Sequence, residues 1–519
     1  MHFAGIDWAI IIVYLILTFA AGLWMRKYVG KVEDYLVAGR EMNVYLGIAS
    51  LAATEVGIVT VMYTAQAGYL NGFAGAIPGI CMAAAMWIVG RTGFVINKLR
   101  RSGAMTLPEL FEKRYSKGVR WLAGVFVAAG GILNMGIFLK LGGQFLVAVT
   151  GLDKPGAGAS LFARLHLPPL ETIMTVLLIG VLIYTALGGM LSVLVTDYIQ
   201  FLFLGASIVV TSVLVLAYCG WDRIYTSAET SLGPAAFNPF LASDMGPGYV
   251  VWQMLTGLGC VLTWQTVIAR VLSSKDEASA RKIYTRTSYY FVGRFALPGL
   301  WGLAALAILG NAFKSADNAE LSLLAMPTYL GQILPVGVVG LLVAGMLAAE
   351  MSTDSSYLLA WSSVIYNDII SPLRSKPFSE RTGLWVNRTL VVAIGVFLLF
   401  YGLWYKIPGR AWDYLQITGE IYFASMSVLV VCALYWKWTH AWGGYAALIL
   451  GAVGPITFLF LSQTESFRKT PAWIPGIGSF ALAAAGMIAG SLIGRRMQSA
   501  PRPPDGEARA GAAPHAAPK

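Results

Sequence analysis

The chain has 519 residues, of which 57% are hydrophobic and only 12% are charged, and its formal net charge is +11. Soluble domains carry about 25% charged residues, so this composition excludes an ordinary soluble protein and predicts one polytopic membrane protein. The positive net charge does not indicate a nucleic-acid partner, because a nucleic-acid-binding face is a clustered and solvated basic patch.

Thirteen apolar runs follow one another along the chain, most of them close to the roughly 20 residues that a helix needs to cross a bilayer. These predicted spans lie near residues 7–25, 44–70, 74–97, 121–150, 170–187, 190–219, 249–269, 287–312, 334–365, 385–405, 411–436, 441–462 and 474–494. We therefore predict an all-α protein in which residues 1–497 form a single transmembrane domain. Residues 498–519 are rich in Pro, Ala and Gly and are predicted to be a disordered cytoplasmic tail.

The Lys and Arg residues between these runs are divided unevenly between the two sides of the membrane. If the runs alternate in direction, 26 of the 37 Lys and Arg residues fall on one side and 8 on the other, and the rest lie within spans. The positive-inside rule assigns the richer side to the cytoplasm. The N-terminus is therefore predicted to lie outside and the C-terminus inside.

Missing motifs exclude several classes of chemistry. The histidines, His2, His166, His440 and His515, all fall in loops or near the chain ends, whereas a membrane haem protein needs histidine inside the bundle. The sequence has no GxxxxGK(S/T) loop and neither an H-E-x-x-H nor a G-x-S-x-G motif, so we predict no ATP hydrolysis and no enzyme activity. Transport, channel and receptor functions remain.

The second predicted span contains a glycine beside polar residues near its middle. Gly57 follows Thr54 and Glu55 closely in the stretch GIASLAATEVGIVTVMYTAQAGY. A helix unwound at this point would free backbone carbonyls, which then need a partner such as Na⁺. A continuous helix in which Gly57 is only a packing notch explains the same stretch, and both interpretations stay open.

The ninth predicted span places several hydroxyl groups on one helical face. Ala349, Ser352, Thr353 and Ser356 follow the i, i+3, i+4, i+7 spacing, and Ser355 lies beside them. Hydroxyl and carbonyl oxygens together suit a hard cation such as Na⁺. Alternatively, the hydroxyls bond to their own helix or allow neighbouring helices to pack closely.

Ionisable residues inside spans are functional-site hypotheses, because a charge is expensive in the bilayer. Glu350 and Asp354 form an i, i+4 pair that could bind a cationic group, carry protons, or pair with Lys140 or Arg294. Asp197, two turns into the sixth span, needs a cation or a hydrogen-bond partner, and we favour a functional role for it.

Several stretches match a known family in order and in predicted side. They are residues 184–192 (YTALGGMLS), 196–200 (TDYIQ), 34–40 (DYLVAGR), Ala349 with Ser352 and Thr353, Arg270 with Ser274 and Lys275, and 434–437 (LYWK). The chain thereby resembles the sodium:solute symporter family from residue 7 to about 495. That family includes bacterial proline, pantothenate, sialic acid and sugar symporters and animal sodium/glucose transporters.

The resemblance implies a fold and a mechanism. The fold would be of LeuT type, with spans 2–6 (about 44–219) and spans 7–11 (about 249–436) as inverted repeats. Spans 2 and 7 would be broken at the midplane, and Gly257 and Gly259 are consistent with a break in span 7. The function would be Na⁺-coupled symport of a small organic solute into the cytoplasm by alternating access, in the cell membrane, with Na⁺ as coupling ion and no other cofactor.

The resemblance also implies two sodium sites. The main site would use the backbone carbonyls of Ala53, Val56 and Ala349 and the hydroxyls of Ser352 and Thr353. A second site, which some family members have, would use Asp197, Ser355 and Ser356.

The identity of the solute is the least constrained prediction. Candidate residues for a solute or proton site are Glu55, Thr60, Lys140, Trp264, Gln265, Glu350, Asp354, Gln416 and Glu420. The stretch AGAIPGICMAAAMW in the third span offers no polar residue for sugar hydroxyls, so a glucose-like solute is disfavoured. The carboxylates among these residues disfavour an anionic solute, unless Lys140 or Arg294 compensates its negative charge. They fit an amine-bearing solute better, such as an amino acid or a polyamine-like cation.

Two alternatives remain from the sequence. A proton-coupled transporter of the same fold would titrate Glu350, Asp354 or Glu55. A channel or a sensor belongs to a different class, and the short tail leaves no room for the signalling domain that sensory relatives carry.

Overall fold

The computed structural model describes residues 4–28, 30–37, 42–151, 168–315, 319–405, 410–462, 464 and 470–499. Within these ranges the regular structure is helical, with one isolated β-bridge between Met42 and Ser274 and no strand. Residues 500–519, most of the predicted tail, lie outside the described part of the chain.

The helices of the first half of the chain are mostly long and apolar. They are α1 (Gly5–Met25), α2 (Val32–Val37), α3 (Val44–Glu55), α4 (Ile58–Asn71), α5 (Ile77–Thr92), α6 (Ile96–Arg101), α7 (Leu107–Arg114), α8 (Lys117–Met135), α9 (Phe138–Thr150), α11 (Pro169–Cys219) and α12 (Trp221–Leu232).

The described part of the second half of the chain is also helical. Its helices are α13 (Gly246–Thr263), α14 (Gln265–Ser273), α15 (Glu277–Leu309), α16 (Ala325–Ile333), α17 (Val338–Val364), α18 (Glu380–Trp404), α19 (Ala411–Tyr435), α20 (Ala441–Leu461) and α21 (Trp473–Ser499). A π-helical segment, Ile365–Ile370, continues α17.

Ten helical segments of the described chain are long and apolar enough to cross a membrane, or eleven if the bent pair α13 and α14 is counted as one span. The count differs from thirteen partly because two predicted spans form the single 51-residue helix α11. That helix is interrupted only at Gly189, whose φ of 55° and ψ of −149° lie in a region that favours glycine. Thirteen spans and their orientation therefore remain predictions.

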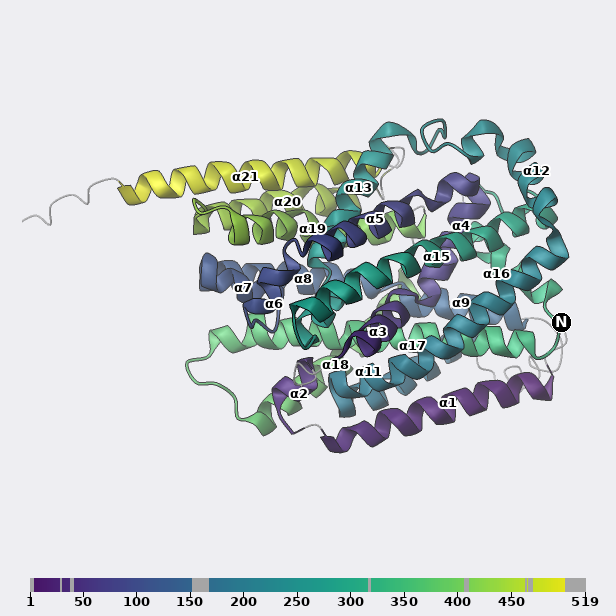
Figure 1. The fold of residues 1–519 in the computed structure, drawn as a ribbon, viewed down its shortest axis with the longest axis horizontal. Helices are drawn as coiled ribbons and strands as arrows, with labels where there is room; N and C mark the ends of the chain where they lie inside the picture. Colours follow the sequence, from purple (N-terminus) through teal and green to yellow (C-terminus); the bar gives the residue numbers. More distant parts are fainter. Residues whose placement is uncertain are drawn as a thin grey trace, which may run out of the picture.

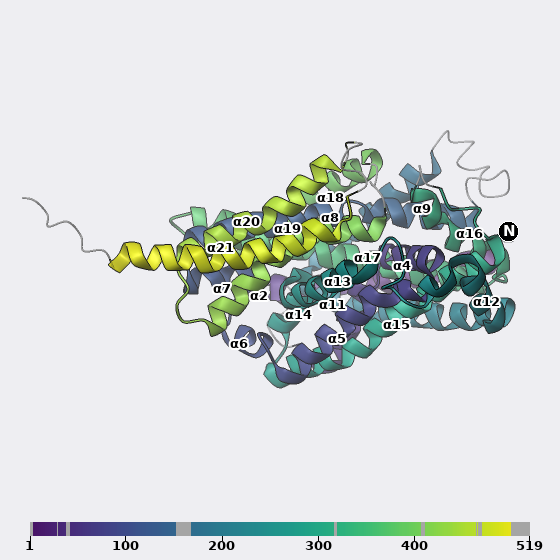
Figure 2. The ribbon, with the colours of Figure 1, turned by 90° about the horizontal axis from the view of Figure 1, so that it is seen from above.

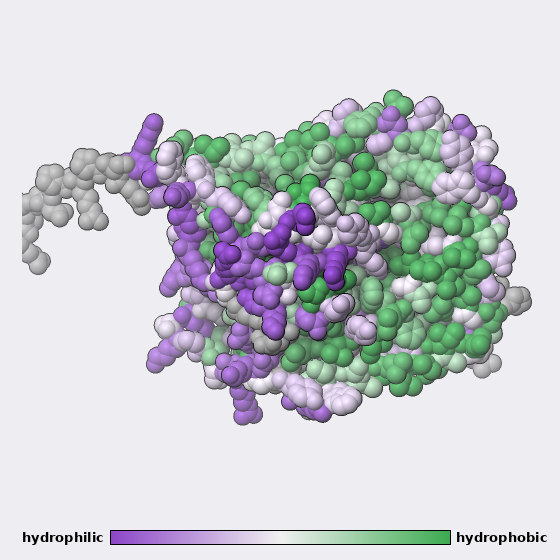
Figure 3. Space-filling model, in the orientation of Figure 1, coloured by the Kyte–Doolittle hydropathy of each residue, from purple (hydrophilic) through white to green (hydrophobic). Residues whose placement is uncertain are grey.

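The long helices run roughly side by side along one direction of the molecule (Figures 1 and 2). The start of α1 and the end of α21 lie at opposite ends of the bundle (Figure 1). Hydrophilic residues gather at the end where α2, α6 and α7 lie, and most of the remaining visible face is hydrophobic (Figure 3). This distribution is what a chain with short polar connections at the membrane surface requires.

Helix α17 lies at the centre of the bundle and is buried over nearly its whole length. It contacts α1, α3, α8, α9, α11 and α18. A helix with apolar and small residues on every face needs neighbours all round, which explains its central position. Its hydroxyl groups are therefore held away from lipid.

Two helices are broken inside the bundle. Between α3 and α4 the backbone leaves the helical region at Val56 (φ −117°, ψ 73°) and Gly57 (φ −76°, ψ 168°). Between α13 and α14 it does so at Trp264 (φ −62°, ψ 116°), with a bend of 41°. Span 7 thus breaks at Trp264. Gly257 and Gly259 lie within α13, against α5 and against Phe480 and Phe423.

Candidate functional site

The break between α3 and α4 meets the hydroxyl face of α17. Thr353 Oγ1 donates a hydrogen bond to the carbonyl of Thr54 at 2.9 Å. A Cβ added at Gly57 would lie 2.8 Å from Thr353 Oγ1, so the missing side chain makes room for this hydroxyl. The interpretation of a continuous helix is therefore wrong: the helix is broken here, and Gly57, which precedes α4, also allows the close approach of Thr353.

The residues predicted for the main sodium site are buried together. Ala53, Val56, Ala349 and Ser352 are fully buried, as is nearly all of Thr353, and they come from the two sides of the α3–α17 contact. Ser352 Oγ donates to Asp197 Oδ1 at 2.6 Å, and Thr353 Oγ1 donates to a carbonyl. A hydroxyl that has given up its hydrogen in this way keeps its two lone pairs for another partner.

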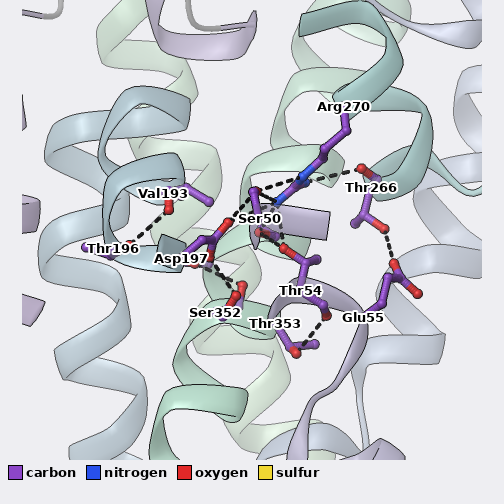
Figure 4. Close-up of polar contacts among 12 residues, drawn as sticks. Ser50, Thr54, Glu55, Val193, Thr196, Asp197, Thr266, Arg270, Ser352 and Thr353 are labelled. Carbon is purple, nitrogen blue, oxygen red and sulfur yellow. Dashed lines mark hydrogen bonds and ion pairs between the residues drawn. The ribbon is translucent and has the colours of Figure 1, made fainter. Parts of the chain in front are cut away.

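Asp197 on α11 is fully buried and accepts three hydrogen bonds (Figure 4). Ser50 Oγ donates to its Oδ2 at 2.5 Å and Ser352 Oγ to its Oδ1 at 2.6 Å. The guanidinium of Arg270 approaches Oδ2 at 3.3 Å. The carboxylate is thus both hydrogen-bonded and paired, as a buried charge must be.

Arg270 follows the predicted span 249–269 and was counted among the 26 bases of the cytoplasmic side, but the structure buries it at this site. It lies on α14, is 1% exposed, and points into the bundle. Besides Asp197, its guanidinium donates to Ser50 at 3.0 and 3.1 Å, to Thr54 at 2.6 Å and to Ser356 at 2.7 Å (Figure 4). The apolar pattern on both sides of it, QTVIARVL, is the signal that indicated burial.

Two of the three residues predicted for a second sodium site are joined by Arg270. Asp197 and Ser356 both contact Arg270, whereas Ser355 Oγ donates to the carbonyl of Ser352 in its own helix at 3.1 Å. Ser356 Oγ also lies 2.9 Å from Thr54 Oγ1.

A cavity lies beside the α3–α4 break, with about 490 Å³ of empty space that includes space open to solvent. Among the predicted solute residues, Glu55, Thr60, Trp264 and Gln416 line it. Its further walls include Arg294, Asn134, Tyr63, Phe138, Tyr357, Trp412 and Phe423, which the sequence analysis did not place in a solute site. Thr353 lines it as well, so the predicted sodium site and the cavity are neighbours.

The charged groups of the cavity wall form one ion pair. Arg294 on α15 lies 3.2 Å from Glu55 Oε2, and both side chains are about 5% exposed. Thr266 Oγ1 donates to Glu55 Oε1 at 3.0 Å, and Arg294 donates to the hydroxyl of Tyr63 at 3.3 Å. The pair joins the end of α3 to α15 at the edge of the cavity.

Aromatic side chains form part of the cavity wall. Trp264, at the α13–α14 break, donates from its indole to Tyr357 at 3.0 Å and stacks on Tyr422 with ring centroids 5.9 Å apart. Tyr63 and Trp412, whose ring centroids are 4.7 Å apart, line this cavity and also a second one of about 340 Å³. These two rings therefore separate two neighbouring cavities.

The other predicted solute residues do not line the larger cavity. Lys140 pairs with Glu320 at 3.2 Å, and Gln265 is buried on α14. Glu420 on α19 accepts hydrogen bonds from the Trp252 indole and from Thr256 at 2.9 Å, so it ties α19 to α13.

Glu350 and Asp354 are buried together on α17. Glu350 faces Gly142 of α9, where an added Cβ would lie 2.7 Å from Oε1. The carboxyl oxygens of both residues have no hydrogen-bond partner within the described chain. Arg294 pairs with Glu55 and Lys140 with Glu320, so these bases are engaged elsewhere.

Comparison with known proteins gives one family and several distant relatives. The family described as "Sodium:solute symporter family" matches residues 35–451. The chain is 26% identical over 482 residues to "Sodium/glucose cotransporter" of Vibrio parahaemolyticus, covering 88% of this chain and 85% of the relative. It is 24% identical over 442 residues to "High-affinity proline transporter PutP" of Bacillus subtilis, covering 83% and 87%. It is 24% identical over 509 residues to "Sodium/glucose cotransporter 4" of Danio rerio, covering 89% and 73%.

Solved structures share the fold. The structure described as "Substrate-bound outward-open state of a Na+-coupled sialic acid symporter reveals a novel Na+-site" has a TM-score of 0.76 at 18% identity and covers 95% of this chain and 98% of that one. "Crystal structure of MhsT in complex with L-phenylalanine" has a TM-score of 0.54 at 15% identity and covers 86% and 98%. These neighbours are LeuT-fold transporters, which agrees with the all-helical architecture.

Proposed function

The chain belongs to the sodium:solute symporter family, and we propose that it carries a small organic solute into the cytoplasm together with Na⁺. It is a multi-pass protein of the cell membrane, and members of its family are transporters, not enzymes. The Na⁺-coupled relatives do not favour the proton-coupled alternative. The observation that carries the proposal is the meeting of the α3–α4 break with the hydroxyl face of α17.

Sodium would bind at that meeting point. Ala53, Val56 and Ala349 would supply backbone carbonyls, and Ser352 and Thr353 would supply hydroxyl oxygens. Oxygen-only ligands suit a hard cation, and a break in a buried helix is where backbone carbonyls become available to one. Thr353 on α17 already donates a hydrogen bond to the carbonyl of Thr54 at 2.9 Å, so an ion bound there would strengthen an existing contact between α17 and α3.

Coupling follows from this position. An ion that ties α17 to the broken helix stabilises the conformation in which both are close, and the solute cavity lies against the same break. Inward movement of one Na⁺ supplies about 2.3 kcal/mol per 100 mV of membrane potential, in addition to its concentration gradient. That free energy can drive accumulation of the solute.

The solute that best fits the cavity is a zwitterion such as an amino acid. The cavity wall carries one carboxylate, Glu55, and one guanidinium, Arg294, in a single pair at 3.2 Å. A solute with an ammonium and a carboxylate group can engage both members, whereas a solute with one charge leaves one member of the pair uncompensated in a nearly dry site. The guanidinium thus changes the sequence-based preference, because it answers a solute carboxylate.

The remaining polar groups give less support to a sugar. The amide of Asn134 donates to the carbonyl of Leu415 at 2.6 Å and to Thr418 at 3.0 Å, so it is engaged in helix packing. Gln416 donates to Gln253 at 3.4 Å. A sugar needs several free donors and acceptors to replace its water shell, and the amide nitrogens of Asn134 and Gln416 already donate hydrogen bonds within the protein.

Reconstituted protein tests the sodium assignment. We expect Na⁺-dependent uptake, and we expect the double substitution Ser352→Ala and Thr353→Ala to remove it. The matched control is Ser362→Ala with Ser363→Ala on the same helix, because these hydroxyls bond only to carbonyls of their own helix among the bonds described. Uptake that proceeds equally well without Na⁺ contradicts the proposal.

A thermal-shift screen tests the solute assignment. Purified protein is heated with amino acids, amines, monocarboxylates and sugars, each with and without Na⁺. Binding to the folded state raises the apparent stability, so a zwitterion whose stabilisation depends on Na⁺ supports the proposal. Stabilisation by a sugar or by a simple amine, with none by zwitterions, rejects the solute class and leaves the sodium assignment in place.

A further inference from the structure

We propose that the guanidinium of Arg270 is a resident cation at Asp197 and takes the place of a second sodium ion, so that the protein binds one Na⁺ per chain. The inference rests on the proposed Na⁺-coupled function. It concerns the residues Asp197, Ser355 and Ser356, which the family resemblance suggested as ligands of a second ion.

The first argument is that the acceptor atoms are already engaged. Asp197 Oδ2 receives Ser50 at 2.5 Å and Arg270 at 3.3 Å, and Oδ1 receives Ser352 at 2.6 Å. Ser356 accepts from Arg270 at 2.7 Å. Two of the three suggested ligands are thus turned toward the guanidinium.

The third suggested ligand uses its hydroxyl hydrogen within its own helix. Ser355 donates to the carbonyl of Ser352 at 3.1 Å, which is a bond within α17. None of the hydrogen bonds described joins Ser355 to Asp197, whereas Arg270 bonds to both Asp197 and Ser356. The geometry of the triad therefore fits a bound guanidinium better than it fits a metal ion.

The second argument is charge. Asp197 is fully buried and Arg270 is 1% exposed, and an arginine keeps its charge inside a protein. The pair is neutral as it stands. A sodium ion added at Asp197 would leave a net positive charge in a buried site, with two like charges in contact with the same carboxylate, which a low-dielectric interior penalises.

The third argument is that the cation is attached to the protein. Arg270 extends from α14 and joins three other helices, through Ser50 and Thr54 on α3, Asp197 on α11 and Ser356 on α17. A sodium ion in this position could leave toward the cytoplasm, whereas the guanidinium cannot. The site therefore provides the positive charge that Asp197 needs without adding an ion to the transported cargo.

Direct counting of bound sodium tests the inference on the unaltered protein. Equilibrium binding of radioactive Na⁺ alone to the purified chain is expected to reach one ion per chain with a Hill coefficient near one. Two ions per chain overturn the inference and leave the proposed function intact. No specific Na⁺ binding at all contradicts the proposed function itself.

Substitution of Arg270 sharpens the test. Arg270→Gln leaves Asp197 without its cation, so we expect the count to rise to two and the Hill coefficient to move toward two. Adding Asp197→Asn to this variant should return the count to one. Arg270→Lys keeps a positive charge, so the number of bound Na⁺ ions per chain should stay at one.

The matched control is Arg120→Gln, which removes another guanidinium paired with a buried acid, Asp368, at 2.8 Å. It should leave the count at one. An Arg270→Gln protein that folds and still binds one ion overturns the inference. If that variant does not fold, the counts for the unaltered protein and for Arg270→Lys decide the question.

Discussion

Two buried ion pairs of the same chemistry lie on opposite sides of the α3 terminus, and they have different surroundings. Glu55 and Arg294 are 3.2 Å apart at the wall of the cavity, whereas Asp197 and Arg270 are 3.3 Å apart and enclosed by four helices. The first pair lines the cavity that we propose for the solute, and the second pair does not. On our proposals, the same pairing of a carboxylate with a guanidinium serves solute recognition in one place and charge compensation in the other, and the difference between them is access to the cavity.

The largest expected effect comes from removing the enclosed guanidinium. Arg270→Met leaves a fully buried carboxylate without a cation, so we expect the free energy of unfolding to fall by about 3–5 kcal/mol in Na⁺-free buffer. Chemical denaturation in detergent measures it. The matched double variant with Asp197→Leu should recover most of the loss. If the free energy of unfolding of Arg270→Met falls by less than about 1 kcal/mol, Arg270 does not compensate the charge of Asp197 as we propose.

Removing the cavity guanidinium should affect solute binding more than folding. For Arg294→Gln we expect the solute KM to rise by roughly 10- to 100-fold, since a lost hydrogen bond to a charged group costs about 1.5–3 kcal/mol. The fall in the free energy of unfolding should be smaller than for Arg270→Met. For each variant, the fall in the free energy of unfolding is compared with the rise in the solute KM. If the ratio of these two changes is the same for Arg294→Gln and Arg270→Met, the assignment of separate roles to the two pairs is wrong.

The approach of Thr353 to the helix break can be tested at Gly57. Gly57→Ala places a Cβ 2.8 Å from Thr353 Oγ1, and we expect the apparent Na⁺ affinity to fall about tenfold, which corresponds to about 1.4 kcal/mol. Gly205→Ala on α11 is the control, because a Cβ there meets nothing within 4 Å. Unchanged Na⁺ activation of uptake in the Gly57 variant shows that this contact does not shape the site.

The smallest expected difference lies between two neighbouring serines. Ser356→Ala removes a hydroxyl that accepts from Arg270 and should lower the free energy of unfolding by about 1 kcal/mol. Ser355→Ala removes a bond within one helix and should stay within about 0.5 kcal/mol. Equal effects of the two substitutions on stability contradict the arrangement around the enclosed pair.

Local patterns predicted much of the fold and part of the site. Apolar runs predicted the helices, and a mid-span glycine made the α3–α4 break one of two open interpretations, because both signals depend on residues close together in the chain. The spacing of Ser352, Thr353 and Ser356 placed three hydroxyls on one face, where the structure has contacts from each to other helices.

Pairings between distant segments were not predictable from these patterns. Arg270 was counted with cytoplasmic bases because it follows an apolar run, and only the turn at Trp264 brings α14 into the bundle. Glu55 and Arg294 are 239 residues apart, and no local pattern joins them. Gly257 and Gly259 suggested a break, yet they lie at close contacts between helices instead.

The attachment of Arg270 to α14 has a consequence for how far the solute can be concentrated. A positive charge fixed to the backbone returns with the protein in every cycle and transfers nothing across the membrane. With a neutral zwitterion and one sodium ion, each cycle moves one charge, so 100 mV supports a concentration ratio of roughly 40-fold from the electrical term. A second mobile ion would square that ratio. One side chain would thus set the steepness of the gradient that the cell can maintain.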